Sequence, residues 1–403
     1  MKDESREAGS LLLRGARLVL PGGVTEGQAL LVERGRIARL LADEDGDAEA
    51  ARAVVVELRG LTLFPGFVDV HIHGAVGVDT MEASAEDLHG VALFLARSGV
   101  TAWLPTLVPA PEEDYRRAVA AIGELMREQD TQRPPAARAV GVHYEGPFVN
   151  TRQCGALRTQ FFRAYRELSD LDALATLDFP GAAHMMTLAP EVEGGVELVR
   201  ELVARGWVVS IGHTRAGLSV LEAAREAGAR HMTHFPNAMP GLHHREPGPV
   251  GWGLTDDRMS VDVIADGIHS DPLMLRLVLR CKTTERVSLI SDAVAPAGLG
   301  DGEYNVWGET IRVAAGRTSN ERGSIAGSVI TMLDAVRMVR GLGLGESELA
   351  RVASFNPARL LHLEGECGSI EAGKRADLTA LDADGRVRLT LVGGRVAFED
   401  FGF

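Results

Sequence analysis

The sequence predicts an α/β protein: a (β/α)8 TIM-like barrel joined to a small β-sandwich domain formed by both termini. Strand-like and helix-like segments alternate along the middle of the chain, and metal-binding side chain types stand at the ends of several of the strands. The two ends of the chain both read as short strands broken by turns. Alternating β and α segments are typical of parallel sheets covered by helices.

Eight apolar or β-branched runs mark the barrel strands. They are "VDVHIH" (68–73), "TAWLPTL" (101–107), "AVGVHYEG" (139–146), "HMMTLAP" (184–190), "WVVSIGHT" (207–214), "HMTHFPNA" (231–238), "SVDVIAD" (260–266) and "VSLISDA" (287–293). Helix periodicity lies between most of them, as in 84–99, which begins on a capping Ser84. A doubly wound sheet is the alternative. No G-x-G-x-x-G follows an early strand, so nothing supports dinucleotide binding.

The two ends of the chain predict one domain between them. Residues 11–63 and the C-terminal segment contain short strands separated by glycine turns and an acidic loop, "DEDGDAEA" at 43–50. Neither end is long enough for a core of its own. We therefore expect residues 1–63 and 367–403 to form the sandwich, with a metal-dependent hydrolase barrel over 64–366.

Composition narrows the class of protein. In 403 residues there is no run near the roughly 20 apolar residues of a membrane span, and the start lacks a secretory pattern, so we expect a cytoplasmic protein that does not contact membranes. The net charge of −14 argues against nucleic acid as a partner. Three widely spaced cysteines predict free, buried or half-buried thiols.

Polar residues at the strand ends predict a metal site. Catalytic side chains of a barrel gather at the C-terminal ends of its strands. Five of the eight runs end in side chains of ligand type: His71, His73, Glu145, His213, His234 and Asp292. Each alone has an ordinary explanation, such as a structural histidine or a helix-capping carboxylate. Together they supply nitrogen and oxygen ligands suited to zinc first, and also to iron, manganese or cobalt. His143 fits structural support or direct ligation.

The motifs resemble one branch of a known superfamily. "PGFVDVHIHG", "HYEGPF", "GHT", "THFPNAM", "HREPG", "ADGIH" and "SDA" are similar to the amidohydrolase superfamily, within it to the N-acetylglucosamine-6-phosphate deacetylases. The resemblance continues through "NPAR" (356–359) and "GSIEAGKRADL" (368–378), and so covers nearly the whole chain. It implies a barrel with a small β-sandwich built from both termini.

The resemblance also implies roles for residues. Glu145, His213 and His234 would hold one divalent metal, and His71 and His73, with Glu145 bridging, a second, so one or two ions are expected. Asp292 matches the catalytic base, the alternative being a metal ligand or an orienting residue. Relatives often use a carbamylated lysine as the bridge. The only lysines here are Lys2, Lys282 and Lys374, which favours a glutamate instead.

Substrate contacts follow from the same resemblance. They would recognise a small phosphorylated amino sugar, and they comprise Ala156, Leu157, Asn237, Ala238, Arg245, His269, Ile325, Ala326 and Gly327. Arg245 would reach the neighbouring site of a homodimer, or else form a surface ion pair. The segment 325–327 would close over the substrate, or else be an ordinary helix start.

The implied activity is hydrolysis of the acetamide of N-acetylglucosamine 6-phosphate to glucosamine 6-phosphate and acetate, a step of amino-sugar catabolism. The alternatives are a deacetylase of another substrate, such as N-acetylgalactosamine 6-phosphate or an N-acyl amino acid, and a non-catalytic binding protein of this fold. One departure bears on the choice. Relatives carry "KGAH" where this chain has "CGAL", so Leu157 replaces a hydrogen-bonding histidine. A second metal at His71 and His73 could compensate.

Overall fold

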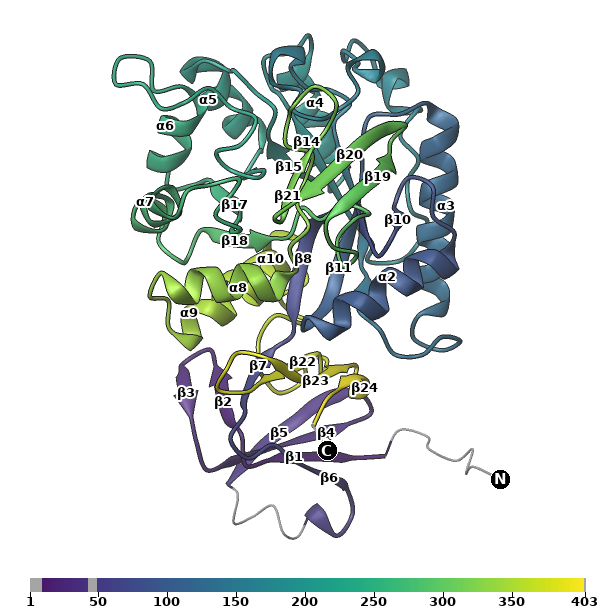
Figure 1. Cartoon of the computed structure of the whole chain (residues 1–403), viewed down its shortest axis with the longest axis vertical. Coiled ribbons are helices and arrows are strands. Elements are labelled where there is room, and N and C mark those ends of the chain that lie inside the picture. Colours follow the sequence, from purple (N-terminus) through teal and green to yellow (C-terminus); the bar gives the residue numbers. More distant parts are fainter. Residues whose placement is uncertain (1–8, 43–48, 402–403) are drawn as a thin grey trace.

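The computed structural model describes residues 9–42 and 49–401. Most of the predicted acidic loop, at 43–50, lies outside these ranges. The described chain has two parts, a helix-covered barrel and a smaller β-sheet region beside it (Figure 1).

The barrel confirms the predicted fold class. Its eight parallel strands coincide with the eight predicted runs, and neighbours pair in chain order. They are β8 (Phe67–Ile72), β11 (Val100–Leu107), β13 (Gly141–Glu145), β14 (Ala183–Leu188), β15 (Val208–Ile211), β16 (His231–Met232), β17 (Ser260–Ile264) and β18 (Val287–Ile290). A short extra strand, β12 (Arg138–Ala139), also pairs with β11. The strands are almost wholly buried because helices cover them outside and side chains fill them inside.

The seam between β18 and β8 closes differently from the other edges. No ladder pairing joins these two strands in the described chain. Instead the Asp292 backbone N–H donates to the His71 carbonyl at 2.9 Å, just beyond β18. The Ser291 hydroxyl donates to the buried Asp69 carboxylate at 2.6 Å. The barrel is thus closed by residues of the predicted site.

Helices follow most strands, and their caps explain where they start. Ser84 accepts from the Asp87 N–H, and Asp87 accepts from the Ser84 N–H, which is a capping box at the start of the first barrel helix. Asp271 caps the helix after β17. The barrel helices are α2 (Ala85–Arg97), α3 (Glu112–Glu128), α4 (Gly195–Ala204), α5 (Leu218–Ala227), α6 (Gly248–Thr255), α7 (Pro272–Lys282) and α8 (Met332–Gly341). The chain then runs through α9 (Glu346–Ala350), η5 (Arg351–Phe355) and α10 (Asn356–Leu360).

The connection from β13 to β14 is the exception to this alternation. Residues 146–182 contain three short 3-10 helices in place of an α-helix, η2 (Thr151–Gln153), η3 (Thr159–Phe161) and η4 (Leu168–Leu171). Gly146, with φ 83°, and Gly155, with φ 55°, adopt left-handed backbone in this connection, and the Gly146–Pro147 peptide bond is cis.

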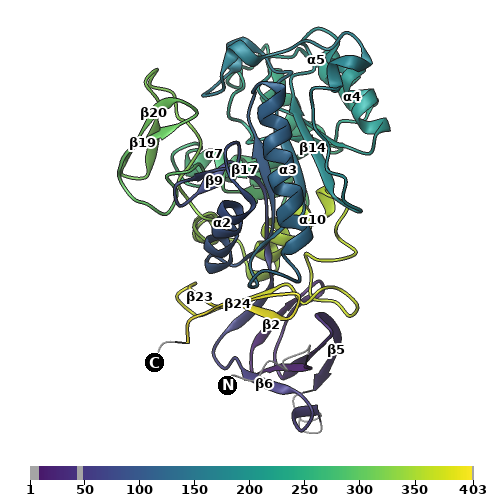
Figure 2. The same cartoon turned by 90° about the vertical axis from the view of Figure 1, so that its right-hand side faces the viewer.

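Both termini contribute to the second part, as predicted. One sheet has the order β5-β4-β1-β6 and the other β24-β23-β22-β7-β2-β3, so C-terminal strands extend an N-terminal sheet. Figures 1 and 2 show this region below the N-terminal ends of the barrel strands. The exact boundaries at 63/64 and 366/367 stay predictions. The strands are β1 (Leu11–Arg14), β2 (Arg17–Leu20), β3 (Gly23–Thr25), β4 (Gln28–Glu33), β5 (Arg36–Ala42), β6 (Val54–Glu57), β7 (Thr62–Pro65), β22 (Leu378–Leu381), β23 (Val387–Val392) and β24 (Arg395–Glu399).

A small antiparallel sheet beyond β18 was not predicted. It consists of β19 (Gly302–Val306), β20 (Glu309–Ala314) and β21 (Arg317–Ser319). Figures 1 and 2 show it projecting from one side of the barrel, near the short hairpin of β9 (Gly74–Ala75) and β10 (Val78–Asp79). The turn between β19 and β20 carries Trp307, which has a left-handed backbone at φ 55°.

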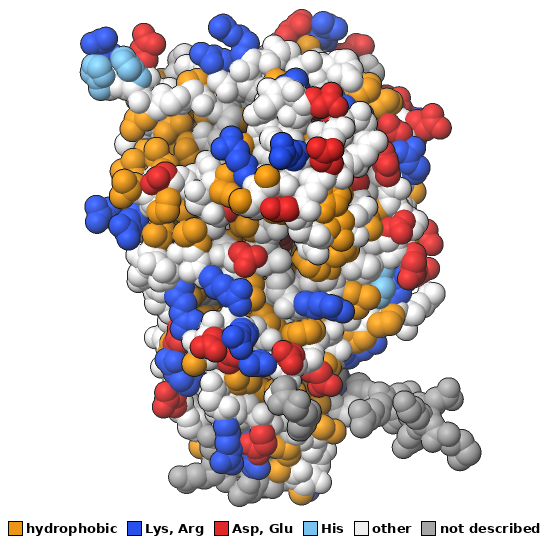
Figure 3. Space-filling view, viewed as in Figure 1, with side chains coloured by type: hydrophobic (Ala, Val, Ile, Leu, Met, Phe, Trp, Pro, Cys, Tyr) orange, Lys and Arg blue, Asp and Glu red, His pale blue; other side chains and the backbone are white. Residues whose placement is uncertain are grey.

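The surface agrees with the compositional expectations in most respects. Acidic and basic side chains are interspersed over the face in Figure 3, so the negative charge is not gathered in one patch there. All three cysteines are free, but Cys281 is exposed, so the prediction that every thiol is at least half-buried was wrong for it. It lies near the end of α7, where the helix periodicity turns it to solvent. Among the described residues, no helix has the length and apolar character needed to cross a membrane.

Candidate metal centre and active-site pocket

Six predicted residues meet at the C-terminal end of the barrel. His71 lies in β8, Glu145 ends β13, and the others follow their strands by one or two residues. All are at most 7% exposed although all are ionisable. This shared group comprises His71, His73, Glu145, His213, His234 and Asp292. Three of them, His213, His234 and Asp292, have left-handed backbones with φ between 33° and 49°. Strained backbone of this kind is concentrated at functional sites.

Two ligand triads share one carboxylate. The potential ligand atoms of Glu145, His213 and His234 all lie within 4.8 Å of one another, and so do those of His71, His73 and Glu145. Glu145 Oε1 is 2.8 Å from His213 Nε2 and 2.9 Å from His234 Nε2. Its Oε2 is 3.4 Å from His73 Nε2. Glu145 is therefore placed to bridge two positions.

The first triad fits a cation. The Gln153 carbonyl, which can only accept, lies 2.7 Å from His213 Nδ1, so this nitrogen carries the ring proton. His213 Nε2 then points toward the Glu145 carboxylate, with His234 Nε2 only 3.1 Å away, so when the His213 ring is neutral its lone pair faces that carboxylate. Such converging acceptors need a shared proton or a positive ion between them. Imidazole and carboxylate in this arrangement are ligands for zinc and similar divalent metals.

The second triad has a similar shape. His71 Nε2 and His73 Nε2 lie 3.1 Å apart, and Nδ1 of each ring is buried without a hydrogen-bond partner in the described chain. Asp292 Oδ1 stands opposite the pair, 3.4 Å from His71 Nε2 and 3.3 Å from His73 Nε2. Asp292 therefore faces this triad and the open pocket, whereas Glu145 lies between the two triads.

Burial and charge compete across this site. Burial alone would raise the pKa of Glu145, but the charge and hydrogen bond of His213 and hydrogen bonds from His234 and His73 hold it well below its usual range. Burial disfavours a charge on His73, yet Asp292 and Glu145 outweigh it and raise the pKa of His73 to about 10. Burial lowers the pKa of His71 well below its usual value. Without a metal, these pKa shifts favour one positive charge on the pair, carried by His73, with His71 neutral.

A buried layer behind the triads orients them. His143 uses both ring nitrogens, Nδ1 at 3.0 Å from the Val70 carbonyl and Nε2 at 2.8 Å from the Thr187 hydroxyl. It belongs to neither triad, which favours the structural reading of His143. Burial lowers its pKa to about 4, so the ring stays neutral.

A series of buried hydrogen bonds also supports His234. The His234 backbone N–H donates to Asp262, whose other carboxylate oxygen lies 2.9 Å from His231 Nε2. His231 Nδ1 is 2.7 Å from the Ser260 hydroxyl. No sequence pattern marked His231 or Asp262, because their partners lie on different strands.

Comparison with known proteins decides the family. A model described as the amidohydrolase family matches residues 62–397. This chain belongs to the amidohydrolase family. It is 36% identical over 387 residues to an N-acetylgalactosamine-6-phosphate deacetylase of Escherichia coli O157:H7, covering 96% of this chain and 99% of that protein. It is also 35% identical over 339 residues to an N-acetylglucosamine-6-phosphate deacetylase of Bacillus subtilis, covering 83% of this chain and 84% of that protein.

Solved structures agree with the sequence comparison. The N-acetylglucosamine-6-phosphate deacetylase of Pasteurella multocida has a TM-score of 0.87 at 30% identity and covers 96% of this chain and 99% of that chain. An aspartate-to-alanine variant of the Mycobacterium smegmatis deacetylase, in complex with N-acetyl-D-glucosamine-6-phosphate, has a TM-score of 0.85 at 32% identity. It covers 96% of this chain and 99% of its own.

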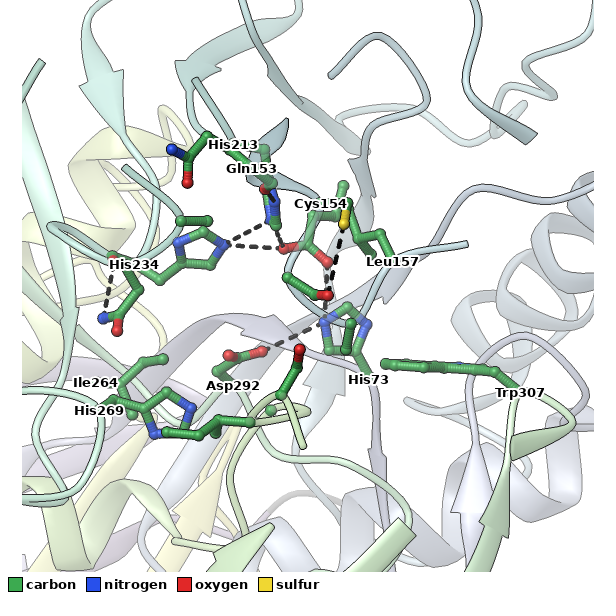
Figure 4. A pocket seen from close by; sticks show the side chains of 18 of the residues that line it. His73, Gln153, Cys154, Leu157, His213, His234, Ile264, His269, Asp292 and Trp307 are labelled. Atoms are coloured by element: carbon green, nitrogen blue, oxygen red, sulfur yellow. Dashed lines mark hydrogen bonds and ion pairs between the residues drawn. The ribbon is translucent and has the colours of Figure 1, made fainter. Parts of the chain in front are cut away.

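The amidohydrolase site opens into a cavity of about 500 Å³ (Figure 4). Twelve of the predicted site residues line it: His73, Glu145, Ala156, Leu157, His213, His234, Asn237, Ala238, His269, Asp292, Ile325 and Gly327. The His269 ring is held at Nδ1 by the Asp266 carboxylate at 2.6 Å. Burial would raise the pKa of Asp266, but this hydrogen bond and the charge of His269 keep it below its usual value.

Three predicted residues lie elsewhere. His71 is completely buried behind His73. Ala326 is also completely buried, and its N–H donates to the Thr318 hydroxyl, so it supports the loop without facing the cavity. Arg245 lies on an exposed loop outside the cavity of its own chain, where its Nη1 is 3.1 Å from His244 Nε2.

The cavity also has walls that the sequence did not indicate. Trp307, from the unpredicted hairpin, stands edge-on to His73 with ring centroids 5.4 Å apart. Figure 4 shows its indole at the side of the site beyond His73. The other lining residues that were not predicted are Arg152, Gln153, Cys154, Gly155, Ile264 and Ser324. The only local signal was the turn formed by Trp307 and Gly308, which says nothing about the site it faces.

Single substitutions should separate the two triads. Glu145→Ala removes the ligand that both triads share. The wild type should hold one or two metal ions per chain, and this variant should hold almost none. His213→Ala should empty only the first triad and His71→Ala only the second, because each histidine belongs to one triad. Metal analysis by mass spectrometry, with circular dichroism to confirm folding, measures this. Full metal content in a folded Glu145→Ala variant would contradict the assignment.

Proposed function

We propose that this amidohydrolase removes the acetyl group of N-acetylglucosamine 6-phosphate, giving glucosamine 6-phosphate and acetate. The observation that carries the proposal is the meeting of two histidine–glutamate triads and Asp292 at the floor of one cavity of suitable size. The relatives that share its length are deacetylases of 6-phosphorylated N-acetyl sugars. Each predicted ligand position carries a histidine or carboxylate side chain that can bind a metal. This argues against a non-catalytic binding protein, in which such ligands are typically lost.

The proposed ligands of the metal are the two triads. Glu145, His213 and His234 would hold one ion, and His71 and His73, with Glu145, a second. Zinc suits this donor set first, and iron, manganese and cobalt also suit it. When bound, a divalent metal lowers the pKa of a coordinated water and polarises a carbonyl oxygen, which assists attack on an unreactive amide.

Asp292 is proposed to move the proton. Its carboxylate lies at the cavity floor, 7% exposed, where it can accept a proton from the attacking water. Water oxygen adds to the carbonyl carbon, the carbon–nitrogen bond breaks, and Asp292 gives its proton to the departing nitrogen. Its position is fixed from both sides, because its N–H donates to the His71 carbonyl and its carbonyl accepts from Ser328 at 2.7 Å.

Recognition of the phosphate is proposed for cationic and polar residues at the cavity rim. His269, with its Nδ1 held by Asp266, Asn237 and the backbone of Ala238 would contact the sugar phosphate, with the segment 325–327 closing over it. Arg152 lines the same cavity and adds a guanidinium suited to a phosphate. The free state of all three cysteines supports a cytoplasmic location for the enzyme.

A second candidate substrate is N-acetylgalactosamine 6-phosphate. The observation in its favour is the similarity, over almost the full length of both chains, to a deacetylase of that sugar. The two substrates differ only in the direction of one hydroxyl, so a shared catalytic floor serves either. Leu157, which lines the cavity where many relatives place a histidine, leaves the choice open to experiment.

An acetate-release assay on matched sugars tests the function. We expect kcat/KM to fall about 100-fold or more when the 6-phosphate is absent, because charge-assisted hydrogen bonds to it are lost. Asp292→Asn should lower kcat by about a thousandfold while metal content is retained. A higher kcat/KM for N-acetylgalactosamine 6-phosphate would select the second candidate. Equal activity on phosphorylated and unphosphorylated sugars, or preference for N-acyl amino acids, would contradict both.

Leu157 allows a test of the second triad. Leucine cannot donate to a substrate carbonyl, so we propose that the second ion replaces the missing histidine. His71→Ala with His73→Ala should therefore reduce kcat, and adding Leu157→His should recover at least about tenfold of the loss. Metal analysis must show that the first triad stays loaded. Wild-type activity in the double variant, with an empty second triad, would refute the idea.

Arg245 is proposed to act in the neighbouring subunit of a homodimer. Its place outside its own cavity, on an exposed loop with the 51% exposed Leu242, supports this. Asp292→Asn and Arg245→Ala subunits, co-expressed with different tags, should complement each other. Random pairing makes half of the dimers mixed, each with one complete site, so about a quarter of wild-type activity should return. No gain over the separate variants would contradict action in trans.

A further inference from the structure

A second cavity lies at the opposite end of the barrel from the active site. It has a volume of about 340 Å³ and lies where β15, β17 and β18 begin, beside α10. The "NPAR" motif, for which the proposed reaction has no use, supplies two of its walls, Asn356 and Arg359. Arg230 and Arg286, which precede β16 and β18, supply two more. The cavity is built from five separate segments of the chain, within 203–209, 228–230, 258–260, 285–288 and 356–362.

Three of the four arginines that line this cavity have no carboxylate partner among the described residues. Arg286 makes no side-chain hydrogen bond or ion pair with the described residues. Arg230 donates only to backbone carbonyls, those of Arg225 at 2.5 Å and Ala229 at 2.8 Å. Arg359 donates to the Glu285 carbonyl at 2.8 Å, and its guanidinium lies over a phenylalanine ring. Three uncompensated cations thus face one cavity in a chain of net charge −14.

The remaining charges at the cavity are already paired. A fourth lining arginine, Arg258, lies 3.1 Å from the Glu226 carboxylate. Glu285 is the one carboxylate residue of the lining, and it forms an ion pair with Arg351. These pairs leave the positive charge of the other three arginines without an internal counter-charge.

Asn356 fixes the wall that α10 contributes to the cavity. It is 5% exposed, and its amide group donates to the carbonyls of Thr284 at 2.8 Å and Val287 at 2.6 Å. These hydrogen bonds tie α10 to the start of β18.

We propose that this cavity binds a small phosphorylated ligand. The phosphate lies among Arg230, Arg286 and Arg359, since guanidinium groups match phosphate oxygens in shape and charge. The apolar part of the ligand lies against Trp207, which also lines the cavity. The volume suits a sugar phosphate or a similar metabolite. Free inorganic phosphate shares the charged part of this chemistry.

The test locates and measures the anion on the full, metal-loaded chain. Crystals soaked in tungstate, a phosphate mimic, should show anomalous scattering between Arg286 and Arg359. Calorimetry at constant ionic strength then compares inorganic phosphate with glucose 6-phosphate for the wild type and for Arg286→Ala with Arg359→Ala. The matched control is Arg97→Ala, an exposed arginine on α2 that also lacks an ion pair and does not line the cavity.

We expect the double variant to lose at least about tenfold in affinity for one class of anion site, while Arg97→Ala matches the wild type. KM for the deacetylase substrate should stay unchanged, which separates this cavity from the active site. Tighter binding of glucose 6-phosphate than of phosphate assigns a phosphorylated metabolite, and equal binding assigns free phosphate. No anomalous peak in the cavity, or undiminished binding in the double variant, would overturn the proposal.

Discussion

The site depends on one buried carboxylate. Glu145 is 4% exposed, and a lone ionised carboxylate at that depth would be strongly destabilising. Four histidines from three other strands surround it, and together with Glu145 they form the two ligand triads found among the described residues. The same feature that makes the centre costly to fold without a cation makes it a strong binder of one. We therefore expect a bound metal to stabilise the folded barrel end.

The closure of the barrel and the position of Asp292, the proposed proton-transfer group, depend on the same contacts. β8 and β18 share no ladder, and the seam is held by the Asp292 N–H on the His71 carbonyl and by Ser291 on Asp69. Burial raises the pKa of Asp69 to about 7, against the hydrogen bonds from Ser291 and His71 that lower it. A change that loosens this seam moves Asp292 away from His71 and His73 at the same time.

The barrel and the metal-binding residues at the bottom of its cavity could be predicted from the sequence, because both depend on local sequence patterns. Eight short apolar runs predict the strands, and five of them end in side chains of ligand type. Because the ends of barrel strands lie together, the six residues from His71 to Asp292 could be named in advance. The walls were harder. Trp307 and Arg152 reach the cavity from long connections whose path depends on packing, not on periodicity. Ala326 was placed in the wall although its side chain is buried, because a three-residue run does not tell which member faces inward. The proposed role of Arg245 cannot be checked in a single chain, because that role lies in the neighbouring subunit.

Reconstitution of the metal-free enzyme tests the central claim most directly, that the Glu145 centre carries amide hydrolysis. Wild-type protein stripped by a chelator is titrated with zinc while acetate release from N-acetylglucosamine 6-phosphate is followed and bound metal is counted. The account predicts no activity at zero equivalents and recovery in step with metal occupancy of the triads, up to two ions per chain. Full activity in protein shown to be free of metal would contradict it.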